Sequence, residues 1–175
     1  MITIYTDWSS IWNPGPWGWW VLILKNLQLW IKNDTGISWW EDWTTNNRME
    51  LSAVIEALKW LNTNWHTNAP TTLYMDSMYV HNGIEKFLAS WIARGWRLAN
   101  KKPVLNKDLW MELNTLLPTC PQITRKWVKA HATSKHNNAV DRLARGKALS
   151  IQKNLPKNFN PPIALDMNTQ KPLFF

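Results

Sequence analysis

The sequence predicts an α/β fold in which a five-stranded mixed sheet is flanked by helices. The first observation is the order of the periodic segments, which along the chain is strand, strand, strand, helix, strand, helix, helix, strand, helix. Strands separated by helices should lie parallel, whereas three opening strands should form an antiparallel meander. The second is composition, since 45% hydrophobic and 18% charged residues in a chain of 175 are typical of one compact folded domain.

The first half of the chain supplies three strands and the longest helix. One strand runs from Ile2 to Asp7, and two more are expected at 19–24 and 27–37, joined near residues 25–26 by a segment with weak turn chemistry. A helix is expected over 44–62, with threonine and asparagine residues placed to cap its start. Its apolar residues recur at helical spacing: Leu51, Val54, Ile55, Leu58 and Leu61.

The second half predicts a strand at 71–75, a helix, a basic stretch, a further helix, a strand at 122–129 and a last helix at 138–149. The helix after residue 77 has an apolar side: Val80, Ile84, Phe87, Leu88 and Trp91. Beyond residue 149 repeated prolines break any helix. We therefore expect a folded domain over 1–149 and a Pro-rich C-terminal tail over 150–175.

Charge and cysteine content narrow the functional classes. The formal net charge of +8 and pI near 9.8 suggest a polyanionic partner, although solubility alone would also explain them. The single cysteine excludes an internal disulfide and a cysteine-rich zinc site. No apolar run reaches the roughly 18 residues of a membrane span, and we expect no signal peptide. The expectation is a cytoplasmic monomer that does not enter membranes.

Two aspartates, Asp7 and Asp76, stand at the carboxyl ends of predicted strands. Ligands of open α/β sheets bind at that edge, so the two side chains converge if their strands are neighbours. Two close carboxylates repel each other unless a proton or a cation lies between them, and oxygen ligands suit Mg²⁺ or Mn²⁺. Each aspartate taken alone is better explained as a turn residue.

Two further acids are candidates for the same site. Glu50 borders the buried face of its helix next to Leu51, but its position three residues after Asn47 also fits a capping box. Asp141 is adjacent to the inward Val140 near the start of the last helix, where the helix dipole alone would favour a carboxylate. The case for a metal site rests on the joint occurrence of the four acids.

Four stretches together resemble the bacterial type of ribonuclease H. They are ITIYTD at 2–7, NPGP with TTNNRMEL, YMDSMYVHNGI, and WVKAHATSKHNNAVDRLA, in the family's order over roughly residues 1–149. The stretch RGWRLANKKPVLNKDLW resembles the family's basic protrusion. The resemblance implies a ribonuclease H-like fold and an endoribonuclease that hydrolyses the RNA strand of an RNA–DNA hybrid.

The resemblance also implies the roles of individual residues. Asp7, Glu50, Asp76 and Asp141 would be the catalytic metal ligands for two Mg²⁺ ions, with Mn²⁺ as a substitute, and the products would carry 5′-phosphate and 3′-hydroxyl ends. His131 matches a loop histidine that assists proton transfer or product release, and the alternative is a solvent-exposed loop histidine.

Substrate contacts are implied in two regions. Asn13, Thr45, Asn46 and Asn47 match positions that contact the nucleic-acid backbone, although capping alone would explain the last three. Residues 94–107, the basic handle, would grip the hybrid. Its proposed contacts, with the preceding tryptophan, are Trp91, Arg94, Trp96, Arg97, Lys101 and Lys102. The alternative is a solvated loop that its tryptophans anchor to the core.

Tryptophan is anomalously frequent, with 15 Trp against 6 Gly, whereas about 12 Gly is average for this length. Seven tryptophans stand at positions where glycine would serve close packing or a positive φ. Trp8 and Trp12 stand where the family has Gly, and Trp17 and Trp20 fall in a glycine-rich turn and strand start. The other three lie in a predicted loop: Trp39, Trp40 and Trp43. Three further tryptophans, Trp30, Trp60 and Trp65, are additional candidates for the same set. Our hypothesis is that UGA codons for glycine, as some bacterial lineages use them, have been read as tryptophan. If Trp8 is genuine, its bulk beside Asp7 favours a hybrid-binding module without catalysis.

The tail ends in QKPLFF, where Gln170, Leu173 and Phe174 resemble the peptide by which bacterial replication proteins dock on the sliding clamp. The alternative is that these apolar residues fold back on the domain. Two other functions share the fold: the ribonuclease H domain of a reverse transcriptase and a non-catalytic hybrid-binding module. The presence of all four carboxylates favours a catalytic protein. A free N-terminus at the first strand and the lack of a polymerase segment lead us to expect a stand-alone enzyme.

Overall fold

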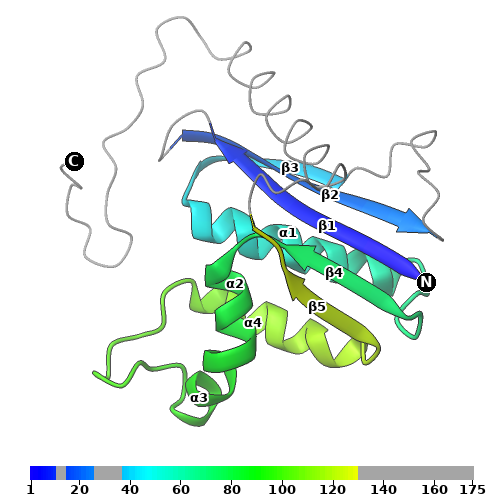
Figure 1. Ribbon diagram of the computed structural model, residues 1–175. Coiled ribbons are helices and arrows are strands. Elements are labelled where there is room, and N and C mark those ends of the chain that lie inside the picture. Colours follow the sequence, from blue (N-terminus) through cyan, green and yellow to red (C-terminus); the bar gives the residue numbers. More distant parts are fainter. Residues whose placement is uncertain (11–14, 26–36, 130–175) are drawn as a thin grey trace, which may run out of the picture.

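The computed structural model describes residues 1–10, 15–25 and 37–129, with the backbone alone described for 8–10, 15–20, 25 and 37–43. Its strands form one sheet in the order β3-β2-β1-β4-β5 (Figure 1). The strands are β1 (Ile2–Ser10), β2 (Gly15–Lys25), β3 (Ile37–Thr44), β4 (Thr71–Met75) and β5 (Ile123–Trp127). β1, β2 and β3 pair antiparallel, whereas β4 lies parallel to both β1 and β5. The prediction of a mixed α/β sheet is confirmed.

The third strand corrects a prediction. We expected a loop carrying Trp39, Trp40 and Trp43, but β3 includes all three tryptophans. The expected strand at 27–37 lies, apart from Ile37, outside the described residues. The expected loop was wrong because aromatic residues favour strands and this segment pairs with β2. Backbone pairing of β2 with β3, such as Trp19 opposite Trp39, sets the register.

The helices lie in two groups. The longest, α1 (Asn46–Thr63), packs against β1 and β2 and beside α4 (Lys107–Leu116), as Figure 1 shows. The segment after β4 holds α2 (Met78–Asn82), the π-helical turn η1 (Gly83–Phe87) and α3 (Leu88–Ala93), and the 3₁₀ turn η2 (Leu117–Thr119) follows α4. None of the described helices is both long and apolar enough to cross a membrane.

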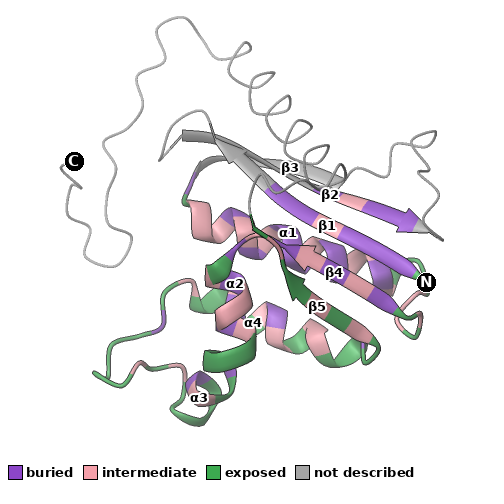
Figure 2. Cartoon of the chain, in the orientation of Figure 1, coloured by how far each residue is buried: buried purple, intermediate pink, exposed green. Residues whose placement is uncertain are grey.

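The core lies between α1 and the sheet (Figure 2). All five apolar residues that predicted α1 are buried, with at most 2% of each exposed. Burying each large aliphatic side chain contributes roughly 1.5–3 kcal/mol to folding. This packing fixes α1 against β1, and therefore fixes the start of α1 near the carboxyl end of that strand.

The π-helical turn divides the helix predicted after residue 77. A π-turn inserts a residue and rotates the side chains that follow. Val80, Leu88 and Trp91 are buried as the helical spacing predicts, but Phe87 is 46% exposed. Gly83 packs so closely on the Trp110 ring that a Cβ there would lie 2.0 Å from its Cη2 atom. The turn thus allows α4 to approach the segment that carries the candidate site.

Candidate active site

Asp7 and Asp76 occupy equivalent positions on neighbouring strands. β1 and β4 are parallel, and Thr6 is opposite Met75, so each aspartate is the next residue along its chain. Asp7 is 7% exposed, and Asp76 is half-buried. The two strands are neighbours, as the sequence-based expectation required, and their register brings both aspartates to the same edge of the sheet.

Glu50 reaches the same place from α1. It lies in the second turn of that helix, between the fully buried Met49 and Leu51. These two neighbours hold the helix against the sheet, so the half-buried Glu50 is directed to the edge where β1 and β4 end. Its carboxylate accepts a hydrogen bond from the Ser77 hydroxyl.

The three carboxylates line one pocket, the carboxylate pocket. Its lining residues are Thr6, Asp7, Glu50, Ala53, Val54, Met75, Asp76 and Ser77. The polar lining consists of carboxylate and hydroxyl oxygens, which are hard ligands suited to Mg²⁺ or Mn²⁺. Within the described ranges, no three His, Cys, Asp or Glu side chains form a group that could hold an ion by themselves.

The remaining predicted site residues lie outside the described residues. They are Asn13, His131 and Asp141, together with Gln170, Leu173 and Phe174 of the tail. The pocket therefore brings together three of the four predicted metal ligands.

The turn after β4 is held from the opposite side by β5. Trp127 Nε1 donates a hydrogen bond to the carbonyl oxygen of Asp76 at 2.8 Å, and Val128 N donates to Met75 O at 2.9 Å. Sequence analysis assigned no role to Trp127 or Ser77. Ser77 follows Asp76 at the start of a helix, which is a signal for a cap, but its contact with Glu50 depends on tertiary packing.

At the start of α1, polar groups remain available for a ligand. Thr45 is the exposed N-cap residue, yet its side chain makes no capping hydrogen bond, and its carbonyl accepts from the backbone of Arg48 and Met49. Asn46 Oδ1 is buried and has no hydrogen-bond partner. Asn47 is half-buried in the first turn. Side-chain capping therefore does not explain Thr45.

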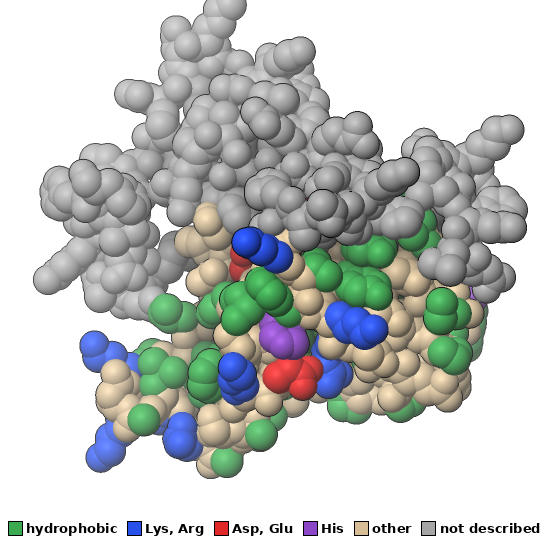
Figure 3. All heavy atoms as spheres, in the orientation of Figure 1, with side chains coloured by type: hydrophobic (Ala, Val, Ile, Leu, Met, Phe, Trp, Pro, Cys, Tyr) green, Lys and Arg blue, Asp and Glu red, His purple; other side chains and the backbone are tan. Residues whose placement is uncertain are grey.

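The basic handle is a short, internally bonded loop. Arg97 and Pro103 form an isolated antiparallel bridge, and the Arg97 guanidinium donates to the carbonyl of Lys101 at 3.0 Å. Arg94, Arg97, Lys101 and Lys102 are exposed, and Figure 3 shows Lys and Arg side chains on the protruding part of this face. Trp96 is half-buried, whereas Trp91 is only 8% exposed, so Trp91 packs in the core rather than presenting its ring to solvent.

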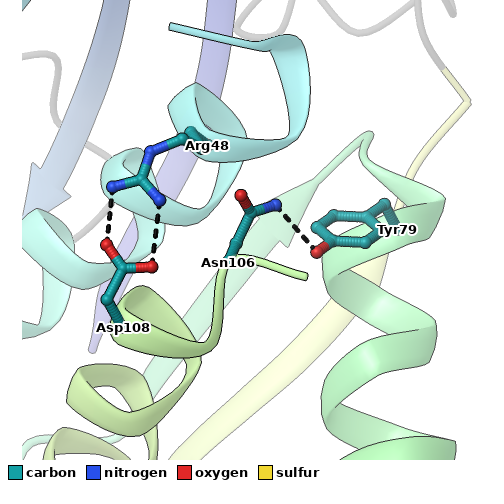
Figure 4. A network of polar contacts seen from close by, with 4 residues as sticks. All are labelled: Arg48, Tyr79, Asn106 and Asp108. Atoms are coloured by element: carbon teal, nitrogen blue, oxygen red, sulfur yellow. Dashed lines mark hydrogen bonds and ion pairs between the residues drawn. The ribbon is translucent and has the colours of Figure 1, made fainter. Parts of the chain in front are cut away.

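Tyr79 anchors the handle to the helix that follows Asp76. Its hydroxyl oxygen accepts from Asn106 Nδ2 at 3.1 Å, as Figure 4 shows, and from Trp110 Nε1 at 3.0 Å. Trp91 meets Trp110 edge to face, with ring centroids 5.1 Å apart. Asn106 lies near the end of the handle, and Tyr79 lies in α2, three residues after Asp76. These bonds therefore connect the handle to the helix that follows Asp76.

A bidentate ion pair joins the starts of α1 and α4. Arg48 Nη1 and Nη2 donate to the two carboxylate oxygens of Asp108 at 2.9 and 2.6 Å (Figure 4). The Arg48 guanidinium hydrogen-bonded to Asp108 lowers the pKa of that carboxyl below its ordinary value of 3.8. The pair fixes the helix that carries Glu50 relative to the helix that follows the handle.

Comparison with known proteins defines the class of this α/β protein. The family model described as RNase H matches residues 1–149. Ribonuclease H of Ehrlichia canis (strain Jake) is 44% identical over 146 residues, which are 83% of this chain and 93% of that protein. Ribonuclease H of Wolbachia pipientis wMel is 43% identical over 144 residues, 82% of this chain and 92% of that protein. The chain belongs to the ribonuclease H family and is a nuclease.

Solved structures agree on the fold. LC9-RNase H1, a type 1 RNase H with the type 2 active-site motif, is similar with a TM-score of 0.67 and 26% identity, over 85% of this chain and 72% of that chain. The PFV RNase H domain has a TM-score of 0.69 at 25% identity, over 85% and 94%. LC11-RNase H1 in complex with RNA/DNA hybrid has a TM-score of 0.62 at 24% identity, over 85% and 99%. The ribonuclease H-like fold expected from the sequence is confirmed.

Proposed function

We propose that this nuclease cleaves the RNA strand of RNA–DNA hybrids internally and leaves 5′-phosphate and 3′-hydroxyl ends. The observation that carries the proposal is the carboxylate pocket, where Asp7, Glu50 and Asp76 meet at the carboxyl edge of the sheet. Relatives named ribonuclease H and the hybrid bound by the similar LC11-RNase H1 support the choice of substrate.

The donor set of the pocket fits a divalent metal. Mg²⁺ is usually held by one or two carboxylates together with substrate phosphate and water, rather than by a full cage of protein ligands. The three pocket carboxylates, with Asp141, would therefore hold two ions. A phosphate of the substrate would complete their coordination. When bound, two Mg²⁺ ions supply activation of a water molecule and stabilisation of the leaving 3′ oxygen, and Mn²⁺ would substitute.

The other assigned residues bind and orient the hybrid. Thr45, Asn46 and Asn47, with Asn13, would contact phosphates at the start of α1, where backbone N–H groups also favour anions. Arg94, Arg97, Lys101, Lys102 and Trp96 would hold the duplex from the handle, and Trp91 would support them from the core. His131 would assist proton transfer or product release.

The proposal extends to the whole chain. Residues 1–149 would form the catalytic domain of a cytoplasmic monomer. Residues 150–175 would form a tail that docks on a sliding clamp through Gln170, Leu173 and Phe174. Removing residues 169–175 should abolish clamp binding without reducing hydrolysis, and clamp binding that survives the truncation would overturn this assignment.

The function is tested with an end-labelled substrate panel of RNA–DNA hybrid, double-stranded RNA, single-stranded RNA and double-stranded DNA. In Mg²⁺, we expect internal cleavage of the hybrid's RNA strand alone, fragments with 5′-phosphates, and complete loss of cleavage in EDTA. A parallel variant with Gly at the seven suspect tryptophan positions tests the alternative that Trp8 blocks catalysis. A folded Gly variant that binds the hybrid and leaves the RNA intact would favour the non-catalytic binding module.

A further inference from the structure

Ser77 is a buried polar residue that the proposed machinery does not use, and it touches two parts of the site. It is 7% exposed and lines the carboxylate pocket. Its hydroxyl oxygen accepts from the backbone N–H of Val80 at 3.1 Å, which makes it the N-cap of α2. The same hydroxyl donates to Oε2 of Glu50, which lies 27 residues earlier in the chain.

The chemistry of a hydroxyl makes the two contacts complementary. A serine hydroxyl has one proton to donate and lone pairs that accept. Because the Val80 N–H occupies the acceptor side, the oxygen is held in place, and its single proton is directed to Glu50. A hydrogen bond to a carboxylate is stronger than one between neutral groups. The rotamer of Glu50 is therefore selected by the cap of α2.

Ser77 follows Asp76 in the chain, so its hydrogen bond to Glu50 also holds the turn that carries the Asp76 carboxylate. The turn is fixed from the other side, because Trp127 Nε1 donates to Asp76 O at 2.8 Å. Glu50 belongs to α1 and Asp76 follows β4, and Ser77 links these two elements within the pocket. We propose that Ser77 is a positioning residue that sets the placement of the Glu50 carboxylate relative to Asp76 for metal binding.

The inference rests on the metal-binding part of the proposed function. Partners that hydrogen-bond to metal ligands typically contribute about 10–100-fold in metal affinity or activity. Replacing Ser77 with Gly removes the donor, yet Gly is nearly as good an N-cap as Ser, so α2 should persist. Replacing it with Thr keeps both the donor and the cap. Ser90, whose hydroxyl donates to Phe87 O at 2.8 Å in α3, offers a matched deletion outside the pocket.

The experiment titrates MgCl₂ into the full-length protein without substrate by calorimetry, and measures kcat and KM on the hybrid for the same variants. We expect Ser77→Gly to lower Mg²⁺ affinity and kcat by about 10–100-fold while KM for the hybrid stays unchanged. Ser77→Thr should restore both values, and Ser90→Ala should match wild type. Circular dichroism and thermal melting verify the fold of each variant.

Two results would overturn the positioning role. One is a folded Ser77→Gly protein with wild-type Mg²⁺ affinity and kcat. The other is a Ser77→Thr protein as impaired as Ser77→Gly, because the hydroxyl would then not be the cause. The titration separates this inference from the proposed function. A wild-type protein that binds Mg²⁺ in a Ser77-dependent way but leaves the hybrid intact would contradict hydrolysis and keep the positioning role.

Discussion

At the scale of single residues, the C-terminal ends of α1 and α3 have the same backbone conformation, in which one position favours glycine. After α3, Gly95 N donates to Ile92 O and Trp96 N donates to Trp91 O, with Gly95 at φ +62°. After α1 the same pair of bonds forms: Trp65 N donates to Asn62 O and His66 N donates to Leu61 O. This is the Schellman motif, and glycine is its usual residue at the left-handed position.

In α1 that position is occupied by Trp65, at φ +59° and with 92% of its surface exposed. A left-handed conformation costs a residue with a Cβ about 1–2 kcal/mol. The ring gains little packing in return because it faces solvent. The left-handed backbone and the exposed ring of Trp65 therefore support including it among the suspected displaced glycines.

Replacing Trp65 with Gly should stabilise the protein by about 1 kcal/mol, because the left-handed strain is removed. Urea unfolding monitored by circular dichroism measures the change. Trp65→Ala is the matched control, since it removes the exposed ring but keeps the Cβ, and it should leave stability nearly unchanged. Equal stabilisation by both variants would mean that the ring, and not the backbone conformation, is the source of the cost.

The recoding hypothesis makes its own prediction. Mass spectrometry of the protein from its native source should find glycine at positions 8, 12, 17, 20, 39, 40 and 43, and at 65. Trp91, Trp110 and Trp127 should remain tryptophan, since their rings make the packing and hydrogen-bond contacts described above. Native peptides that carry tryptophan at the suspect positions would remove the hypothesis.

At the scale of elements, the handle and the pocket are joined by a few polar contacts between helices. Tyr79 accepts from both Asn106 and Trp110, and Trp110 is fully buried. Asn106 itself lies at φ +55° at the start of α4. The end of the handle is therefore defined by its bond to α2 and by the backbone turn at Asn106.

Tyr79→Phe should lower stability by about 1–3 kcal/mol, because it leaves the buried Trp110 N–H without its acceptor. It should also raise KM for the hybrid more than it lowers kcat, since the handle loses its anchor while the carboxylates stay in place. Urea unfolding and steady-state kinetics measure the two effects. The matched control is Tyr74→Phe, whose ring stacks on Tyr5 with centroids 4.8 Å apart. A KM equal to that of the control would contradict the anchoring role.

The ion pair between α1 and α4 predicts a pH dependence. Arg48 lowers the pKa of Asp108, so the stabilisation is present above the ordinary value of 3.8 and is lost as pH falls through the lower folded pKa. The Asp108 side chain is 60% exposed, which limits the contribution to below about 1 kcal/mol. Asp108→Asn should therefore be slightly less stable than wild type at pH 6. The difference should shrink towards zero near pH 3 in urea unfolding, and a difference independent of pH would contradict this assignment.

The sequence predicted features that depend on neighbouring residues and missed those that depend on contacts between distant segments. Asp7 and Asp76 were found because strand ends are local features, and Glu50 because it borders the apolar face of a strongly periodic helix. The segment with Trp39, Trp40 and Trp43 was wrongly predicted to be a loop, because its strand conformation is decided by pairing with β2 rather than by local residues. The π-turn at Gly83 was missed because one inserted residue barely changes an apolar pattern. The Ser77 contact with Glu50 joins distant segments, so no local pattern could reveal it.

At the scale of the whole molecule, the excess of positive charge should govern association with the hybrid. The formal net charge is +8, and exposed cations of the handle lie on a segment anchored beside the pocket. Each neutralised phosphate contributes roughly 0.7–0.9 to the slope of log affinity against log salt concentration. In the proposed function, the handle would supply sequence-independent affinity and the carboxylate pocket would supply the chemistry.

Replacing Arg94, Lys101 and Lys102 with Gln should reduce that slope by about 2–3, since three phosphate contacts would be lost. Arg97 is kept because its guanidinium holds the loop through Lys101 O. Fluorescence anisotropy with labelled hybrid in Ca²⁺, at several salt concentrations, measures the effect. An unchanged slope would show that the handle does not touch phosphate.

The central claim is that the carboxylate pocket is the nuclease site, and the most direct test compares wild type with Asp76→Asn on an end-labelled RNA–DNA hybrid in Mg²⁺. The substitution removes a metal-ligating charge but keeps the Asp76 carbonyl that Trp127 holds, so the fold should survive. Because a bound metal stabilises the transition state by several kcal/mol, the account predicts cleavage slower by on the order of 10³-fold with unchanged hybrid affinity. A folded Asp76→Asn protein that cleaves the RNA strand at the wild-type rate would contradict it.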